Sequence, residues 1–368
     1  MKRSLNLISI AGFFTIIVML AVSTLIFGRD SLPGIFSSKA DIRVKTETFI
    51  NSSFPLDDNW RSLHTMIYGA VTGETIDDIF SDEDRLIRVY PSYDKDRAFS
   101  NVGLINNFAR TTGTPISLVL APTAAGVYHD SLPDYIENTD QLEIINSLYY
   151  KLGKGVGSID MFYPLYSAKG DYIFYRTSDC WTSLGAYYAY EEMMRQLGAQ
   201  PFDLSNYDLE YADDSYYGEL YRELRYMSCD EDSINLFRPK LDSTVSEVKL
   251  YRDNEEISAR SVYFKSAFAG ANKNDVYLHG DDYTRAEIDT TSESGLRLLL
   301  IKGHYANTLV SFLLPHYEHI TIVDPDRLKA EGKTLSDVAE PDSYNRILIM
   351  YDCVQFSRTD SFDIFNDK

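Results

Sequence analysis

The fold class is decided by Ile116-Ser-Leu-Val-Leu-Ala121 and Leu296-Arg-Leu-Leu-Leu-Ile-Lys302, two short runs that are almost wholly apolar. Pro122 stops the first run and Gly303 stops the second. Such runs are typical of strands that are buried on both faces of a parallel sheet. Helical patterns alternate with them along the chain, so we expect an α/β fold whose largely parallel sheet is covered by helices on both faces.

Further elements follow from the same alternation. We expect strands at 158–162, 319–323 and 346–351, and helices at 141–152, 182–197 and 305–314. Thr182 can cap the second helix, since its hydroxyl can accept a backbone N–H of the first turn. The stretch 202–288 is acidic and rich in tyrosine, and it is interpreted as an insertion or a mixed β segment.

The balance of charge excludes one class of function. The 368 residues contain 35 lysines and arginines against 55 aspartates and glutamates, which gives a formal charge of −20. A chain this acidic repels a phosphate backbone, so nucleic-acid binding is excluded. The three cysteines, Cys180, Cys229 and Cys353, cannot all pair with one another, so no disulfide framework is predicted.

The N-terminus predicts a membrane anchor. Residues 5–28 carry no charge, Lys2 and Arg3 precede them, and Arg29 follows. About 20 apolar residues suffice to span a bilayer, and basic residues stay on the cytoplasmic side. We therefore expect a cytoplasmic tip and anchor at 1–29, a helical lead-in at 30–80 and an extracytoplasmic domain at 81–368. A cleaved signal peptide is the alternative.

Two segments are placed where ligands bind in open α/β sheets, at turns that lead into helices. The first is Tyr175-Arg-Thr-Ser-Asp-Cys-Trp-Thr182, and the second is Ile301-Lys-Gly-His-Tyr-Ala-Asn307. The first resembles the signature Tyr-Arg-Thr-Asp-His-His-Trp-Thr of the DHHW family of bacterial exported proteins. The second resembles that family's Ile-Lys-Asp-Ser-Tyr-Ala-Asn, and further blocks extend the resemblance over about 51–356. The family is similar to SGNH-hydrolase-like proteins of polysaccharide O-acetylation, which implies a three-layer fold.

The resemblance implies a triad whose members are all replaced in this chain. The acid position holds Ser178, the middle position Asp179, the base position Cys180, and the nucleophile position His304. A serine esterase needs an activated hydroxyl, a base and an orienting group. We therefore expect a catalytically degenerate protein with a binding or assembly role linked to acetylation of a cell-surface polysaccharide. The resemblance also implies a membrane-bound O-acyltransferase as a possible partner.

Two alternatives remain open at this point. A thiol opposite an imidazole would form a swapped dyad of Cys180 and His304, with Asp179 or Asp352 orienting the histidine and the helix N-terminus lowering the thiol pKa. That arrangement would make the protein an acyltransferase or esterase. A structural envelope protein, holding a partner through the acidic stretch 207–232, is the third hypothesis.

Four other residues are candidates for substrate binding: Trp181, Asp281, Tyr305 and Asn307. Asp281 stands where the family has the asparagine of a Phe-Leu-Gly-Gly-Asn turn, and its carboxylate would repel a developing oxyanion. His316 and His319 are three residues apart but are separated by a predicted strand start, so we expect no metal site. No cofactor is expected either.

Overall fold

The computed structural model describes residues 14, 15, 17–26, 29, 46, 49, 53, 60, 75–82, 84–224, 229–240, 245–252 and 255–366. The chain divides into two compact units. One unit comprises Met1–Gly73 with Leu224–Met227, and the other comprises Glu74–Glu223 with Ser228–Lys368. All of the described strands belong to the second unit, which is the subject of the following sections.

In the first unit, residues 14, 15 and 17–26 are helical, and so are residues 46, 49, 53 and 60. No helix among the described residues is long and apolar enough to cross a membrane. The remainder of the predicted span at 5–28 lies outside the described residues, so the anchor stays a prediction. The predicted helical lead-in ends too late, because its last two residues, Ile79 and Phe80, belong to strand β1.

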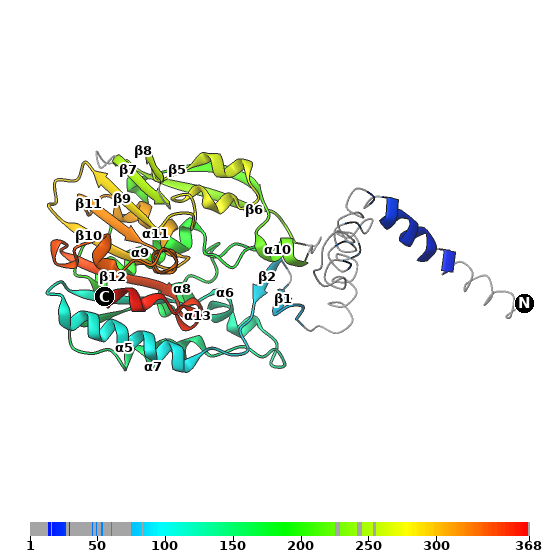
Figure 1. The fold of residues 1–368 in the computed structure, drawn as a ribbon, viewed down its shortest axis with the longest axis horizontal. Helices are drawn as coiled ribbons and strands as arrows, with labels where there is room; N and C mark the ends of the chain where they lie inside the picture. The colour runs from blue at the N-terminus through cyan, green and yellow to red at the C-terminus, as the bar shows by residue number, and fades with distance from the viewer. Residues whose placement is uncertain are drawn as a thin grey trace, which may run out of the picture. The chain divides into compact units, whose positions relative to one another are not determined.

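An eight-stranded sheet forms the centre of the second unit, in the order β4-β3-β12-β10-β11-β9-β7-β8 (Figure 1). The first five strands are parallel, and β9, β7 and β8 continue the sheet in antiparallel fashion. The predicted largely parallel sheet is therefore confirmed in its central part. The strand bounds are β3 Ile116–Ala121, β4 Val156–Asp160, β7 Val245–Arg252, β8 Glu255–Ala259, β9 Arg285–Thr290, β10 Arg297–Lys302, β11 His319–Val323 and β12 Arg346–Asp352.

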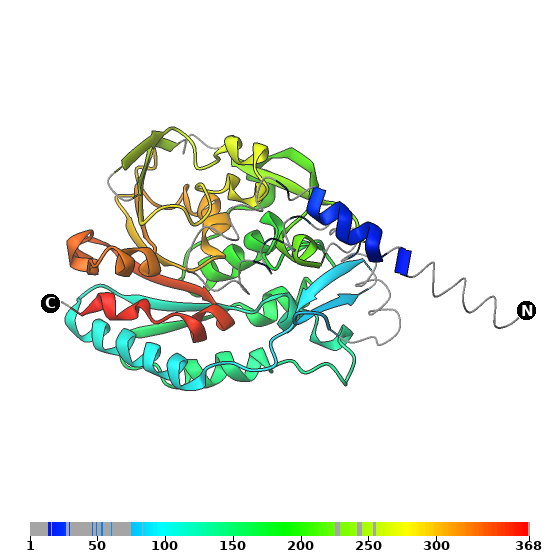
Figure 2. The same cartoon turned by 45° about the vertical axis from the view of Figure 1, so that its right-hand side comes forward.

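The central strands are apolar because both of their faces are covered. All six residues of β3 are buried, and in β10 every residue after Arg297 is buried. Leu300 of β10 lies opposite Leu348 of β12 on one side and Ile322 of β11 on the other. Two sets of helices in mutual contact cover the sheet and make a three-layer arrangement, with cyan α5 on one side and α9 and α11 on the other (Figures 1 and 2).

The first set consists of α5 Lys95–Thr111, α7 Gln141–Tyr149 and α13 Cys353–Arg358. The second set consists of α6 Ala124–Val127, α8 Phe162–Ser167, α9 Ser183–Gln196 and α11 Ala306–Leu313. The predicted cap of α9 is confirmed, since the Thr182 hydroxyl accepts the N–H of Gly185. Smaller elements are β1 Ile79–Asp82, β2 Arg85–Arg88, α12 Pro325–Ala330 and the 3-10 turns η1 His129–Ser131, η2 Leu204–Asn206, η3 Lys265–Ala269, η4 Lys273–Val276, η5 Leu335–Asp337, η6 Pro341–Ser343 and η7 Ser361–Phe365.

The acidic, tyrosine-rich stretch at 202–288 is a mixed β segment. A hairpin of β5 Tyr207–Tyr216 and β6 Asp232–Pro239 stands apart from the main sheet, and α10 Glu219–Leu224 lies between its strands in the sequence. The later part of the stretch supplies β7 and β8, which extend the main sheet. The stretch is therefore built into the domain and is not a separate insertion.

Candidate functional site

The site forms where β10 and β12 end beside the start of α9. Parallel strands bring their carboxyl ends to the same edge of a sheet, so the residues that follow β10 and β12 are neighbours. Lys302 ends β10, and Asp352 ends β12 and caps α13 by accepting the N–H groups of Val354 and Gln355. Gln355 in turn accepts the backbone N–H of His304, at 2.8 Å. These contacts fix the backbone of the second family-like segment.

A left-handed turn brings Asp281 to this edge. Leu278, His279 and Gly280 have positive φ angles of 51°, 63° and 66°. Positive φ is rare for a leucine, and it costs conformational energy that the surrounding structure must offset. The Asn307 side chain holds the turn by donating a hydrogen bond of 2.7 Å to the Gly280 carbonyl. Asn307 therefore acts by positioning Asp281.

Asp281 is the centre of a charged cluster. Its Oδ1 lies 2.5 Å from the Lys302 ammonium, and its Oδ2 accepts a short hydrogen bond from His304 Nδ1. Lys302 also lies 3.3 Å from Asp324 Oδ2, and the Lys302 side chain is only 1% exposed. His304, in contrast, exposes 57% of its side chain. We call Asp281, Lys302, His304 and Asp324 the charged half of the site.

The pKa values in the charged half follow from this pairing. The hydrogen bond to Asp281 raises the pKa of His304 to about 9, although burial opposes the shift. Burial alone would raise the pKa of Asp281, but the charges of Lys302 and His304 outweigh it and hold that pKa well below its usual range. At neutral pH the histidine is therefore a cation that donates hydrogen bonds, and it has no free lone pair to act as a base.

The rest of the site is packed into the domain interior. Tyr90 donates a short hydrogen bond to Asp179 Oδ2, and the backbone N–H of Asp179 donates to Glu219 Oε1 at 2.6 Å. Asp179 Oδ1 is buried and has no hydrogen-bond partner among the described residues. Ser178 also donates to Glu219 Oε1, at 3.1 Å. We call Tyr90, Ser178, Asp179, Cys180 and Glu219 the buried half of the site.

Burial governs protonation in this half. It raises the pKa of Asp179 to about 7, and the nearby carboxylates of Glu219 and Asp352 add to the shift although the Tyr90 hydrogen bond opposes it. Burial likewise raises the pKa of the Cys180 thiol well above its ordinary value, and Glu219 and Asp179 strengthen the effect. The expected lowering by the α9 N-terminus is therefore wrong in direction, because Cys180 is only 8% exposed and faces carboxylates.

In the part of the chain that the structure describes, His304 forms no hydrogen bond or ion pair with the residues that the swapped-dyad hypothesis assigned to it, namely Cys180 as its partner and Asp179 or Asp352 as its orienting group. Among the described residues no hydrogen bond joins the Cys180 thiol to His304. The swapped dyad therefore has no hydrogen bond to support it and stays a prediction. Asp281 contacts the imidazole, whereas Asp352 is occupied by its helix cap and Asp179 by Tyr90.

Two of the other candidates lie in the core. Trp181 and Tyr305 are 0% and 3% exposed, and Trp181 donates to the Tyr305 carbonyl at 3.1 Å. The Tyr305 hydroxyl donates to the Asp179 carbonyl at 2.5 Å, so this aromatic pair supports the buried half.

Sequence reasoning missed Lys302, Tyr90 and Glu219. Lys302 carried a signal, since it is a charged residue that directly follows the apolar residues 298–301 of its strand. Glu219 lies in Tyr216-Tyr-Gly-Glu219, one of the further blocks that extend the family resemblance, while nothing in the sequence distinguished Tyr90. Within the described part of the chain, no group of three or more histidines, cysteines and acids is arranged to hold a metal ion.

The three-layer fold with a polar site at the carboxyl ends of its strands defines the class as an α/β protein. A family model described as DHHW protein matches residues 61–323, which is more than half of the chain. The chain therefore belongs to the DHHW family, as the sequence resemblance indicated.

Solved structures agree in fold. A DHHW family protein from Eubacterium siraeum is 22% identical with a TM-score of 0.63, over 78% of this chain and 93% of that one. PatB1 from Bacillus cereus is 18% identical with a TM-score of 0.66, over 79% of this chain and 99% of that one. PatB1 has also been solved with a sulfonyl adduct, at 17% identity and a TM-score of 0.65, over 78% of this chain and 98% of that one. No curated protein matches the chain.

Proposed function

We propose that this protein is a catalytically degenerate DHHW protein that binds a cell-surface polysaccharide outside the cell. The observation that carries the proposal is the ion pair between His304 and Asp281. At the place where the family pattern has a serine nucleophile, the chain presents a protonated imidazole whose Nδ1 is bonded to a carboxylate. Such a group can bind a hydroxyl or a carbonyl oxygen, but it cannot attack an ester.

The surroundings give acyl transfer no support. The base position holds the buried Cys180 thiol, whose raised pKa keeps it protonated at neutral pH. The thiolate, and not the thiol, is the nucleophile in cysteine chemistry. An oxyanion that developed beside His304 would also meet the Asp281 carboxylate, whereas an active site places hydrogen-bond donors there.

Polysaccharide enters the proposal through the family. The resemblance associates DHHW proteins with polysaccharide O-acetylation, and a fold that has lost its chemistry can keep its ligand. The uncharged stretch at 5–28 would hold the protein at the outer face of the membrane, near such a polymer. Protease added to intact cells should then degrade the domain, and alkaline washing of membranes should leave the chain in the pellet. A domain that protease cannot reach would remove the localisation from the proposal.

Ester turnover tests the loss of catalysis directly. The full chain would be assayed on aryl acetate and on acetylated oligosaccharides, beside Cys180→Ala and His304→Ala variants. We expect no turnover above the uncatalysed rate, or a trace that both variants retain. Turnover that both substitutions abolish would contradict the proposal and establish the swapped Cys180–His304 dyad.

Binding tests the remaining half of the proposal. Purified cell-envelope polysaccharide would be immobilised, and retention of the full chain would be measured beside a heat-unfolded sample of the same chain. We expect retention that soluble polysaccharide competes away. Equal retention of folded and unfolded chain would contradict a specific binding role.

A further inference from the structure

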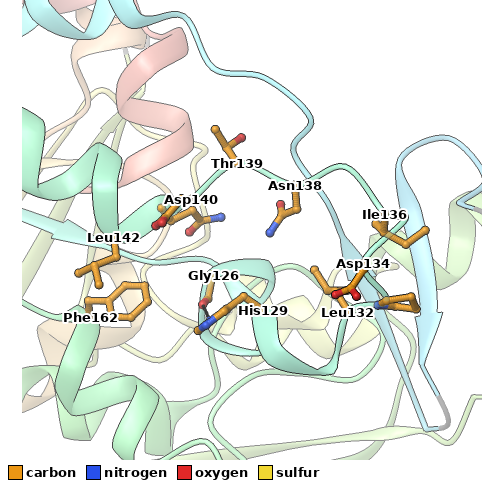
Figure 3. Close-up of a pocket in the computed structure, with 12 residues that line it drawn as sticks. Gly126, His129, Leu132, Asp134, Ile136, Asn138, Thr139, Asp140, Leu142 and Phe162 are labelled. Carbon is orange, nitrogen blue, oxygen red and sulfur yellow. Dashed lines mark hydrogen bonds between the residues drawn. The ribbon is translucent and has the colours of Figure 1, made fainter.

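A pocket of about 310 Å³ lies beside the site, beyond the end of β3. Figure 3 shows its walls, which come from α6, η1, the loop that leads into α7, the first two residues of α7, and the first residue of α8. The pocket belongs to the same strand-end edge as the site, because Cys353, directly after the Asp352 cap, donates to Gln141 Oε1 on the pocket wall at 3.3 Å. None of the residues assigned to the two halves of the site lines this pocket.

The frame of the pocket is fixed by internal hydrogen bonds. Gln141 accepts the N–H of Thr123 and donates to the Thr123 hydroxyl, both at 2.8 Å. Asn138 accepts the N–H of Tyr90 at 3.0 Å and donates to the Ala125 carbonyl at 3.0 Å. A Cβ on Gly126 would lie 2.4 Å from Gln141 Oε1, so only glycine allows this close approach. The pocket is therefore preformed, and a ligand would meet it without reordering these side chains.

Three side chains leave acceptor atoms available to a ligand. His129 Nδ1 lies 2.9 Å from the Gly126 carbonyl, which can only accept, so in the neutral ring Nε2 is left as an acceptor. The Asp134 carboxylate has no hydrogen bond or ion pair among the described residues, and it lines the pocket. Asp140 caps α7, because one of its carboxylate oxygens accepts the Glu143 N–H at 3.0 Å. Its other oxygen has no partner among the described residues.

Another part of the pocket lining is apolar. Phe162 and the aliphatic side chains of Leu132 and Leu142 line the pocket. The His129 ring stacks on Tyr166 with centroids 5.5 Å apart, and Tyr166 stacks on Phe162 at 6.1 Å, so the aromatic wall is held in place. A pocket with apolar faces and a few directed polar atoms is typical of small-molecule sites.

We propose that this pocket binds one neutral pyranose residue of a polysaccharide. A pyranose ring presents C–H faces to the apolar wall formed by Leu132, Leu142 and the 5% exposed Phe162. It donates its hydroxyl hydrogens to Asp134, Asp140 and His129. The described residues that line the pocket include no lysine or arginine, so its two carboxylates repel a sugar that carries a carboxylate or phosphate. The inference rests on the proposed function and narrows it, since it names the ligand as a neutral glycan and places it at the same strand-end edge as the site.

Ligand-observed NMR with the full chain tests the pocket apart from the polymer. The probes are methyl glucoside, methyl galactoside and methyl mannoside, with methyl glucuronide and glucosamine as charged counterparts. The variants are Asp134→Ala and Asp130→Ala. Asp130 is the matched control, because it is on η1 near the pocket and pairs with Lys169 without lining the pocket. We expect at least one neutral glycoside to bind at millimolar concentration, the glucuronide to bind at least tenfold more weakly, and Asp134→Ala to weaken binding at least fivefold while Asp130→Ala leaves it unchanged.

Three results would contradict the proposal that this pocket binds a neutral pyranose. They are equal binding by the Asp134→Ala and wild-type chains, binding of glucosamine alone, and no binding of any glycoside. If the immobilised polysaccharide retains the wild-type chain and Asp134→Ala equally, the pocket is not the binding site, but the proposed function is still supported. If glycosides bind in an Asp134-dependent way but no polysaccharide retains the chain, the pocket proposal is supported and the proposed polysaccharide role is contradicted.

Discussion

The two halves of the site differ in how their ionisable groups are accommodated: by ion pairing in one half and by burial in the other. In the charged half, the partly exposed Asp281 carboxylate pairs with the buried Lys302 ammonium, and His304 stays exposed to solvent with its charge balanced. In the buried half, Asp179 and Cys180 are enclosed, and burial raises the pKa of both groups. The difference shows that one strand-end site can combine an ion cluster whose charges are paired with carboxyl and thiol groups enclosed in the core. Of the two halves, the charged half presents a solvent-exposed hydrogen-bond donor, the His304 imidazole.

The largest effect is expected from breaking the charged half at Lys302. Lys302→Met would leave Asp281 and Asp324 without the buried cation between them. Removing one partner of a buried ion pair costs about 3–5 kcal/mol, so we expect a loss of that size in the free energy of unfolding. Urea denaturation of the full chain measures it.

Lys333→Met is the matched control. Lys333 pairs with Glu331 at 2.7 Å but is 46% exposed, so its loss should cost less than about 0.5 kcal/mol. Equal effects of the two substitutions would show that the charged half is not an interior cluster.

The buried half should respond in the opposite direction. The pKa of Asp179 is raised to about 7, above the value of about 3.9 expected in the unfolded chain. The folded state therefore binds the proton more tightly, and stability is lost as the pH rises from about 4 to 7. Asp179→Asn should raise the free energy of unfolding by about 2–4 kcal/mol at pH 8 and much less at pH 4.

Unfolding in urea at both pH values checks this, with Asp208→Asn as the control. Asp208 is 72% exposed, so its substitution should show no gain that grows with pH. If Asp179→Asn destabilises the protein equally at both pH values, the carboxyl is not held protonated in the fold.

Restoring the family motif sharpens the contrast within one segment. A Cβ on Gly303 would lie 2.6 Å from Gln355 Oε1 and 2.7 Å from Tyr351 Cδ1, and Tyr351 is buried. Gly303→Asp should therefore cost about 1–3 kcal/mol through overpacking. His304→Ser removes an exposed side chain and should cost less than about 1 kcal/mol. Thermal unfolding of the two variants measures the difference, and a Gly303→Asp protein as stable as the wild type would show that the loop still accepts the family residue.

Sequence patterns predicted the fold better than the site. The bounds of β3 and β11 were predicted correctly, and α9 begins where Thr182 was expected to cap it, because local apolar runs and caps decide these elements. The family blocks also identified the chain segments that meet at the strand ends. The partner of His304 was not predictable, since the left-handed turn that brings in Asp281 is held by Asn307, a tertiary contact. Burial of Cys180 also could not be predicted from the sequence, and this burial raises the thiol pKa that was expected to be lowered.

The smallest expected effect tests whether the exposed ion pair matters to stability at all. The pKa of His304 is raised to about 9 by Asp281, above about 6.5 for an unfolded histidine. The stabilisation is therefore complete below pH 6.5 and is lost as the pH rises through 9. Solvent screening limits it to less than about 1 kcal/mol, because His304 is 57% exposed. His304→Ala should thus lower the melting temperature slightly at pH 6 and not at pH 10, and 1 M salt should shrink the difference. A difference that is the same at both pH values would mean that the imidazole acts through packing, and the charged half would then consist of Asp281, Lys302 and Asp324 alone.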